Sequence, residues 1–165
     1  MGAGAAPSRT EDQPMIQATG SLFDTTAPAI GHGVNTSGVM GAGVAALVRS
    51  RWPQLYPAYQ AACHSGTLVP GGVFPWQTRG PGVRILYNLA SQPKPGRYAR
   101  LDLIAKSGAA TLAHAGALGF DRVAIPRIGA GIGGLDWPSV EAVLKTVEAG
   151  TGVEWEVWTP RMAGG

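Results

Sequence analysis

A glycine-rich stretch at residues 126–138 has the composition of an anion-binding loop. Its letters are PRIGAGIGGLDWP, which include four glycines. Residues 121–125 (DRVAI) before it read as a short buried strand. Residues 139–148 after it carry apolar side chains at helical spacing, with Asp136 as the expected N-cap and Pro138 in the first turn. Glycine lets the backbone approach a ligand, and free N–H groups at a helix start attract negative charge. The stretch therefore predicts a seat for a phosphate or diphosphate, with a ligand-free turn as the alternative.

A second glycine-rich segment lies between an apolar strand and a helix in the first third of the chain. Formal G-x-G-x-x-[GA] matches occur twice, as Gly41-Gly43-Ala46 and as Gly129-Gly131-Gly134. A Rossmann dinucleotide site also needs an acidic residue about 20 positions further on. No acidic residue follows Ala46 until Asp102, and after Gly134 the sequence has no room for the rest of a Rossmann unit. No Gly-Lys-[Ser/Thr] occurs, which argues against a P-loop NTPase. We therefore expect a diphosphate-bearing nucleotide that is held by two backbone loops.

The charge distribution is asymmetric although the net charge is only +3. No Asp or Glu occurs between Asp24 and Asp102. The same interval holds Arg49, Arg51, Arg79, Arg84, Lys94, Arg97 and Arg100. A section with one sign of charge favours an anionic ligand or partner, and a solvated Arg-rich surface is the alternative.

Length and composition narrow the class of protein. At 165 residues the chain is expected to form one domain. It has no apolar run long enough to span a membrane, and residues 1–9 lack the apolar core of a signal peptide. The single cysteine, Cys63, is expected to be buried and inert, and the three histidines show no ligand spacing. We expect a cytoplasmic monomer with no metal, no cofactor and no membrane partner.

Alternating strands and helices are predicted to position the two loops. Strands are expected at 15–19, 29–34, 83–89, 121–125 and 153–159, and helices at 44–51, 55–64, 98–118 and 139–148. Residues 20–24 read as a turn, residues 67–78 as an edge or irregular strand, and residues 1–14 as a disordered tail. This order indicates an α/β sandwich around a mixed or mostly parallel sheet. Both glycine loops follow strands, so they are expected to face one crevice at the carboxyl ends of the strands.

Residues 33–45 (GVNTSGVMGAGVA) and 125–137 (IPRIGAGIGGLDW) resemble the two ligand loops of macrodomains, which are ADP-ribose-binding modules. The resemblance covers residues 15–160, and it is closest to the branch that holds the terminal ADP-ribose glycohydrolase and the DNA ADP-ribosyl glycohydrolase antitoxins. It implies a three-layer α/β/α sandwich with a mixed, mostly parallel sheet. It also implies hydrolysis of ADP-ribose from protein carboxylate esters or from thymidine in DNA. A non-catalytic reader and a binder of another phosphorylated nucleotide remain open.

The resemblance also assigns the ligand contacts. The glycine loop would wrap the diphosphate through Arg127, Ile128, Gly129, Ala130, Gly131, Ile132, Gly133 and Gly134. The first loop would line the distal ribose through Val34, Asn35, Thr36, Val39, Met40, Gly41, Ala42 and Gly43. Ser21 and Leu22 would lie beside the adenine, together with Trp158 or Pro160, although simple rim packing also explains Trp158.

Three positions depart from the pattern of the family. Ser21 stands where many macrodomains carry an Asp, and Gly133 replaces the Asp of the terminal glycohydrolase. Gln92 occupies the position of the catalytic Lys of this branch, and an amide nitrogen is no nucleophile. We therefore expect water to attack the ribose, with Asn35 holding the distal ribose and Gln92 positioning the water or the leaving group. Lys94 is the alternative amine.

Overall fold

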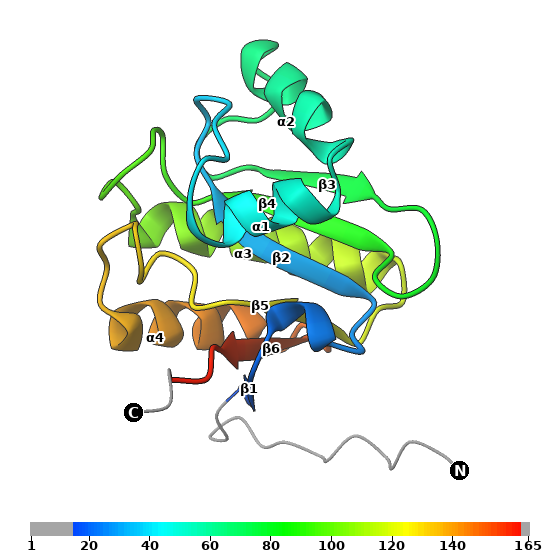
Figure 1. The fold of residues 1–165 in the computed structure, drawn as a ribbon. Helices are drawn as coiled ribbons and strands as arrows, with labels where there is room; N and C mark the ends of the chain where they lie inside the picture. Colours follow the sequence, from blue (N-terminus) through cyan, green and yellow to red (C-terminus); the bar gives the residue numbers. More distant parts are fainter. Residues whose placement is uncertain (1–14, 163–165) are drawn as a thin grey trace.

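A six-stranded sheet forms the middle layer of the protein in a computed structural model, which describes residues 15–162 (Figure 1). The strands are β1 (Ile16–Thr19), β2 (Ala29–Val34), β3 (Val73–Gln77), β4 (Ile85–Ala90), β5 (Arg122–Ile125) and β6 (Glu154–Thr159). Their order is β1-β6-β5-β2-β4-β3, and all neighbours are parallel except β3 and β4. The tail predicted at 1–14 lies outside the described residues.

Two pairs of helices cover the two faces of this sheet. Helices α1 (Gly43–Arg51) and α2 (Leu55–His64) pack on one face, where Val48, Leu55 and Tyr59 share a core with β2 and β4. Helices α3 (Leu101–Ala117) and α4 (Trp137–Glu148) pack on the other face around a second core. The predicted three-layer α/β/α sandwich with a mostly parallel sheet is therefore confirmed.

Most predicted elements are confirmed, with small shifts at their ends. β3 is the antiparallel edge strand, and Pro75 sits within it opposite Tyr87, because an edge strand tolerates a missing N–H donor. The turn at 20–24 contains a single 3₁₀ turn, η1 (Leu22–Asp24). The prediction for Cys63 was wrong in one respect: it is half-buried on α2, although burial raises the pKa of its thiol, which fits an unreactive group.

Helix α3 begins later than predicted, at Leu101 rather than at residue 98. Arg100 has an extended backbone, with φ −133° and ψ 139°. Its N–H donates to the carbonyl of Ser91, and the N–H of Ala99 donates to the carbonyl of Gly133. These hydrogen bonds hold Ala99 and Arg100 against the glycine loop and against the start of their own connection, outside the first turn of the helix.

His32 is a fully buried polar side chain in the middle of β2. Its Nε2 atom lies 2.7 Å from Oδ1 of Asn88. Because the Nδ2 of Asn88 donates to the carbonyl of Phe74, its Oδ1 is the acceptor and the Nε2–H of His32 is the donor. The Nδ1 atom has no partner among the described residues. Burial lowers the pKa of His32 from 6.5 to about 4, so the folded protein holds it neutral.

We expect His32 to make the fold acid-sensitive. In the unfolded chain it gains a proton near pH 6.5, whereas in the folded protein it does so only near pH 4. The free energy of unfolding should therefore fall as the pH drops through this interval, by up to about 3 kcal/mol, and then level off. Urea unfolding across this range, compared with His32→Gln, tests the point. Equal pH slopes in the two proteins would contradict it.

Candidate functional site

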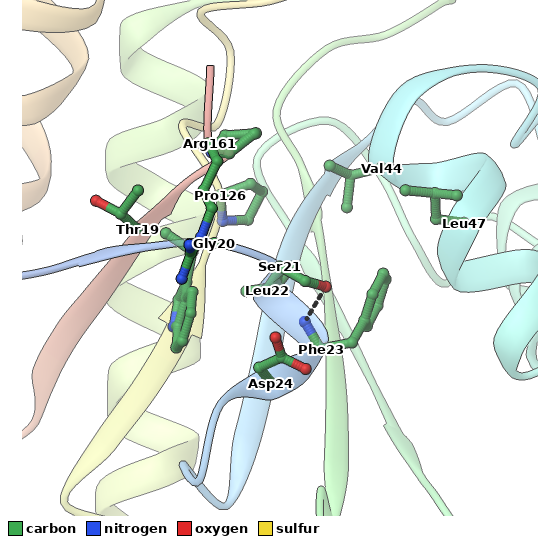
Figure 2. Close-up of a pocket in the computed structure, with 12 residues that line it drawn as sticks. Thr19, Gly20, Ser21, Leu22, Phe23, Asp24, Val44, Leu47, Pro126 and Arg161 are labelled. Carbon is green, nitrogen blue, oxygen red and sulfur yellow. Dashed lines mark hydrogen bonds between the residues drawn. The ribbon is translucent and has the colours of Figure 1, made fainter. Parts of the chain in front are cut away.

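The larger of the two pockets described here lies between η1, α1 and the end of β6, and has a volume of about 560 Å³. Figure 2 shows Val44 and Leu47 projecting from α1 on one side and Gly20 and Arg161 on the other. The complete lining is Thr19, Gly20, Ser21, Leu22, Phe23, Asp24, Val44, Leu47, Pro126, Trp158, Pro160 and Arg161. Its size, its largely apolar wall and its few polar groups suit a nucleobase. Ser21, Leu22, Trp158 and Pro160, all predicted from the sequence, lie together here.

A buried carboxylate connects the walls of this pocket. Glu156 on β6 is 4% exposed and accepts a hydrogen bond from the indole N–H of Trp158 at 2.7 Å. The same side chain accepts from the hydroxyl of Thr25, directly after η1, and from the guanidinium of Arg122 on β5. Burial alone would raise the pKa of Glu156, but these three donors together hold it below its ordinary value. Glu156 thus fixes both the ring of Trp158 and the start of the segment after η1.

A smaller pocket of about 160 Å³ lies between the two loops that follow β2 and β4. Its lining is Gly33, Val34, Asn35, Val39, Gly41, Ala42, Ala45, Gln92, Pro95, Gly96 and Ile132. We call it the distal pocket. Five of the residues predicted for the distal ribose therefore meet here, and Gln92 joins them from another loop. The lining contains no Lys, His, Asp or Glu.

Two helix starts follow the glycine-rich loops, those of α1 and of α4, and they differ in how they are capped. Asp136 caps α4, as predicted: its carboxylate accepts from the N–H of Ser139 at 3.0 Å. That hydrogen bond, with the one from the hydroxyl of Ser139, lowers the pKa of Asp136, so a negative charge already occupies the end of α4. Helix α1 instead begins after Ala42 with no side-chain cap. Its first N–H groups lie between the two pockets and can donate hydrogen bonds to an anion.

The glycines of the loop at 126–138 have different structural roles. Gly129 and Gly134 have φ of 77° and 85°, in the left-handed region. A Cβ at Gly133 would lie 2.6 Å from that of Ala99, so this buried glycine shapes the loop. Gly131 alone is exposed with open space around it. The neighbouring Ile132 reaches across to Gly43 at the start of α1, where a Cβ would lie 3.2 Å from its Cδ1.

Asn35 uses most of its amide to shape its own loop. Its Nδ2 donates to the carbonyl of Val39 at 2.8 Å, and its Oδ1 accepts from the N–H of Ser37 at 3.0 Å. The hydroxyl of Tyr59 on α2 also lies 3.0 Å from this Oδ1 and 2.6 Å from the carbonyl of Asn35. Burial raises the pKa of Tyr59, so it remains a donor at all ordinary pH values. The second Nδ2 hydrogen of Asn35 is left for a ligand.

The side-chain amide of Gln92 also donates its hydrogen bonds within its own loop. Its Nε2 donates to the carbonyls of Lys94 at 2.8 Å and of Gly96 at 3.0 Å. Its Oε1 accepts from no described residue, so toward the pocket Gln92 can act only as an acceptor. The hydroxyls of Thr36 and Ser37 both donate to the carbonyl of Pro93, which joins the two loops around the distal pocket.

The remaining predicted contacts lie beside the pockets rather than in them. Ile128 and Met40 are 3% and 1% exposed and belong to the two cores. Arg127 donates to the hydroxyl of Thr159 at 3.2 Å and lies over Trp137. Ala130 lines neither pocket. Glu156, Tyr59 and Arg161 were missed from the sequence, because nothing in their spacing shows which loop they contact.

Residues 15–162 contain no group of three His, Cys, Asp or Glu side chains that could hold a metal ion. In the same range, none of the helices is both long and apolar enough to cross a bilayer.

The family model for the Macro domain matches residues 32–144. The chain belongs to the macrodomain family. This macrodomain is 33% identical over 144 residues to a DNA ADP-ribosyl glycohydrolase of Thermus aquaticus, a match that covers 86% of the chain and 40% of that protein. It is 32% identical over 128 residues to a DNA ADP-ribosyl glycohydrolase of Mycobacterium tuberculosis, covering 74% and 35%. The chain therefore spans about two fifths or less of these curated relatives.

Solved structures show the same fold. The macrodomain of Mycobacterium tuberculosis DarG superposes with a TM-score of 0.80 at 28% identity, covering 90% of this chain and all of that one. Thermosipho africanus DarTG in complex with ADP-ribose gives a TM-score of 0.79 at 19% identity, covering 93% of this chain and 43% of that one. At that identity, the second likeness concerns the fold alone.

Replacing Glu156 tests whether it holds the walls of the larger pocket. Glu156→Gln keeps the shape but removes the charge that faces Arg122, and we expect a loss of about 1–3 kcal/mol in the free energy of unfolding. The emission of Trp158 should change as well, because its N–H loses a charged acceptor. Asp102→Asn is the matched control: its pair with Arg100 is more than half exposed on both sides and screened by solvent, so the loss of stability should be much smaller. Equal losses of unfolding free energy in the two variants would argue against a stabilising role for the hydrogen bonds of Glu156.

Proposed function

We propose that this macrodomain binds ADP-ribose and hydrolyses the bond between its distal ribose and a DNA base. A protein carboxylate ester is the second candidate linkage. The adenine would occupy the larger pocket and the distal ribose the distal pocket. The observation that carries this proposal is the position of the uncapped start of α1 between the two pockets, with Ile132 of the glycine loop in contact beside it. A diphosphate is the linker that such a seat favours.

The names of the relatives support the DNA linkage. Both the Thermus and the Mycobacterium proteins are DNA ADP-ribosyl glycohydrolases. A relative of Scheffersomyces stipitis, 28% identical over 154 residues, is an ADP-ribose 1''-phosphate phosphatase. All three names describe cleavage at the distal end of ADP-ribose, which is where the distal pocket would hold it.

The chemistry proposed here uses water rather than a side-chain nucleophile. The distal pocket is lined by no amine or carboxylate, and the ammonium of Lys94 lies 4.2 Å from the ring of Tyr98 instead. Water would attack the ribose carbon as the bond to the leaving group breaks, and its proton would pass to the leaving group or to solvent. Gln92 Oε1 can accept a hydrogen bond from that water, and the bound diphosphate stabilises an oxocarbenium-like ribose. Turnover is therefore expected to be slow.

Gly131→Glu tests the anion seat. We expect the wild-type protein to bind ADP-ribose in the micromolar range, about 8 kcal/mol, and the variant to give no heat in calorimetry. Gly131 has no positive φ and has open space around it, so the fold should accept the change. Gly131→Ala is the control and should bind nearly as the wild type. A competition series with AMP, ADP and NAD identifies the ligand, and tighter binding of any of these than of ADP-ribose would reject the proposal.

Asn35→Ala tests the distal pocket. We expect turnover of thymidine-linked ADP-ribose in DNA to fall roughly 10- to 100-fold, because the ribose loses its orientation. The affinity for ADP-ribose should change less than about threefold, since most apolar contact lies in the larger pocket. Tyr59→Phe removes only the hydrogen bonds that support the loop around Asn35, and it should lower turnover less than Asn35→Ala does. If the wild-type protein binds ADP-ribose but releases none from DNA or from protein esters over hours, it is a reader and not a hydrolase.

A further inference from the structure

Two cations that lie over aromatic rings border the distal pocket. On the side of α1, the guanidinium carbon of Arg49 lies 3.7 Å from the ring centre of Tyr56. In the loop before α3, the ammonium of Lys94 lies 4.2 Å from the ring centre of Tyr98, which is 47% exposed. We call these the two cation–aromatic pairs.

The first pair lines a groove that shares Gly41 with the distal pocket. This groove has a volume of about 540 Å³ and is lined by Met40, Gly41, Ala46, Arg49, Ser50, Pro53, Tyr56 and Pro57. Gly41 lines both the groove and the distal pocket. The hydroxyl of Tyr56 donates to the carbonyl of Gly38 at 3.2 Å, so the ring is fixed to the loop that forms the pocket wall.

The second pair belongs to a loop that forms another wall of the pocket. Pro95 and Gly96 line the distal pocket, and they lie between Lys94 and Tyr98 in the chain. The two hydrogen bonds from Gln92 to the carbonyls of Lys94 and Gly96 hold this loop in shape. One cation–aromatic pair therefore adjoins each of two segments that line the pocket, through Gly41 on one side and through Pro95 and Gly96 on the other.

Within residues 15–162, neither cation is paired with a carboxylate. Among the described residues, Arg49 and Lys94 form no ion pair, and no Asp or Glu occurs in the sequence between Asp24 and Asp102. Free cations attract phosphates, and guanidinium planes and tyrosine rings stack on bases. Stacking needs bases that are not already stacked in a duplex, so this combination fits a single strand.

We propose that the two cation–aromatic pairs form a track for single-stranded DNA, which carries the modified base to the mouth of the distal pocket. This inference rests on the proposed DNA linkage and adds the surface that would hold the strand on either side of the modified base. Arg49 and Lys94 would contact phosphates, while the partly exposed ring of Tyr98 and the guanidinium of Arg49 would stack on bases.

Direct binding of an unmodified, fluorescently labelled single strand tests the track without any need for hydrolysis. Arg49→Gln and Tyr98→Leu should each weaken this binding about five- to tenfold. Arg49→Gln should also reduce the slope of log K against log salt by about 0.7. Lys106→Gln, which removes an exposed lysine on α3, is the matched control and should change neither quantity. The affinity for free ADP-ribose should stay the same in all variants, which shows that the site still folds.

Turnover gives a second readout. With ADP-ribosylated single-stranded DNA, kcat/KM should fall by the same factor as the binding constant, whereas ADP-ribosylated thymidine nucleoside should be unaffected. The proposal is overturned if the variants bind the single strand as the wild type does, or if the wild type binds a duplex as tightly as a single strand. It is also overturned if kcat/KM for an ADP-ribosylated peptide falls by the same factor in the variants. If the variants weaken binding of the single strand as expected but the wild-type protein hydrolyses no substrate, the track is supported and the proposed hydrolase activity is rejected.

Discussion

The close contact between Gly133 and Ala99 is the constraint on which the candidate site depends. A Cβ at Gly133 would lie 2.6 Å from that of Ala99, and the N–H of Ala99 donates to the carbonyl of Gly133 at 3.3 Å. This contact brings the glycine loop beside the segment before α3. The hydroxyls of Thr36 and Ser37 then join the loop after β2 to Pro93. Three loops from the carboxyl ends of neighbouring strands are thereby held around one site (Figure 1).

The larger pocket is organised differently, by a charge instead of a close approach. Glu156 is buried and accepts three hydrogen bonds that come from β5, from β6 and from the segment after η1. Removing one partner of such a group leaves an uncompensated buried charge, so the network resists deformation. One half of the site thus depends on backbone fit and the other on a hydrogen-bonded carboxylate. From this division we expect binding and turnover to respond separately to substitution.

Much of the fold and part of the site could be predicted from the sequence. Short apolar runs and helical spacing located the strands and helices, and Pro75 marked the edge strand because proline cannot complete a ladder. Glycine content located the loops, but it could not show that Gly133 serves packing while Gly131 faces open space. The late start of α3 and the roles of Glu156 and Tyr59 depend on partners far away in the sequence. Such contacts leave no local pattern.

A crystal structure of the protein with ADP-ribose would test the central claim most directly. The account predicts adenine between Leu22 and Trp158, the diphosphate against Gly131 and the first N–H groups of α1, and the distal ribose beside Asn35. It also predicts little movement of the three loops, since they are already joined to one another. A diphosphate bound at the acid-capped start of α4, or a ligand that leaves the pocket beside Trp158 empty, would contradict the account.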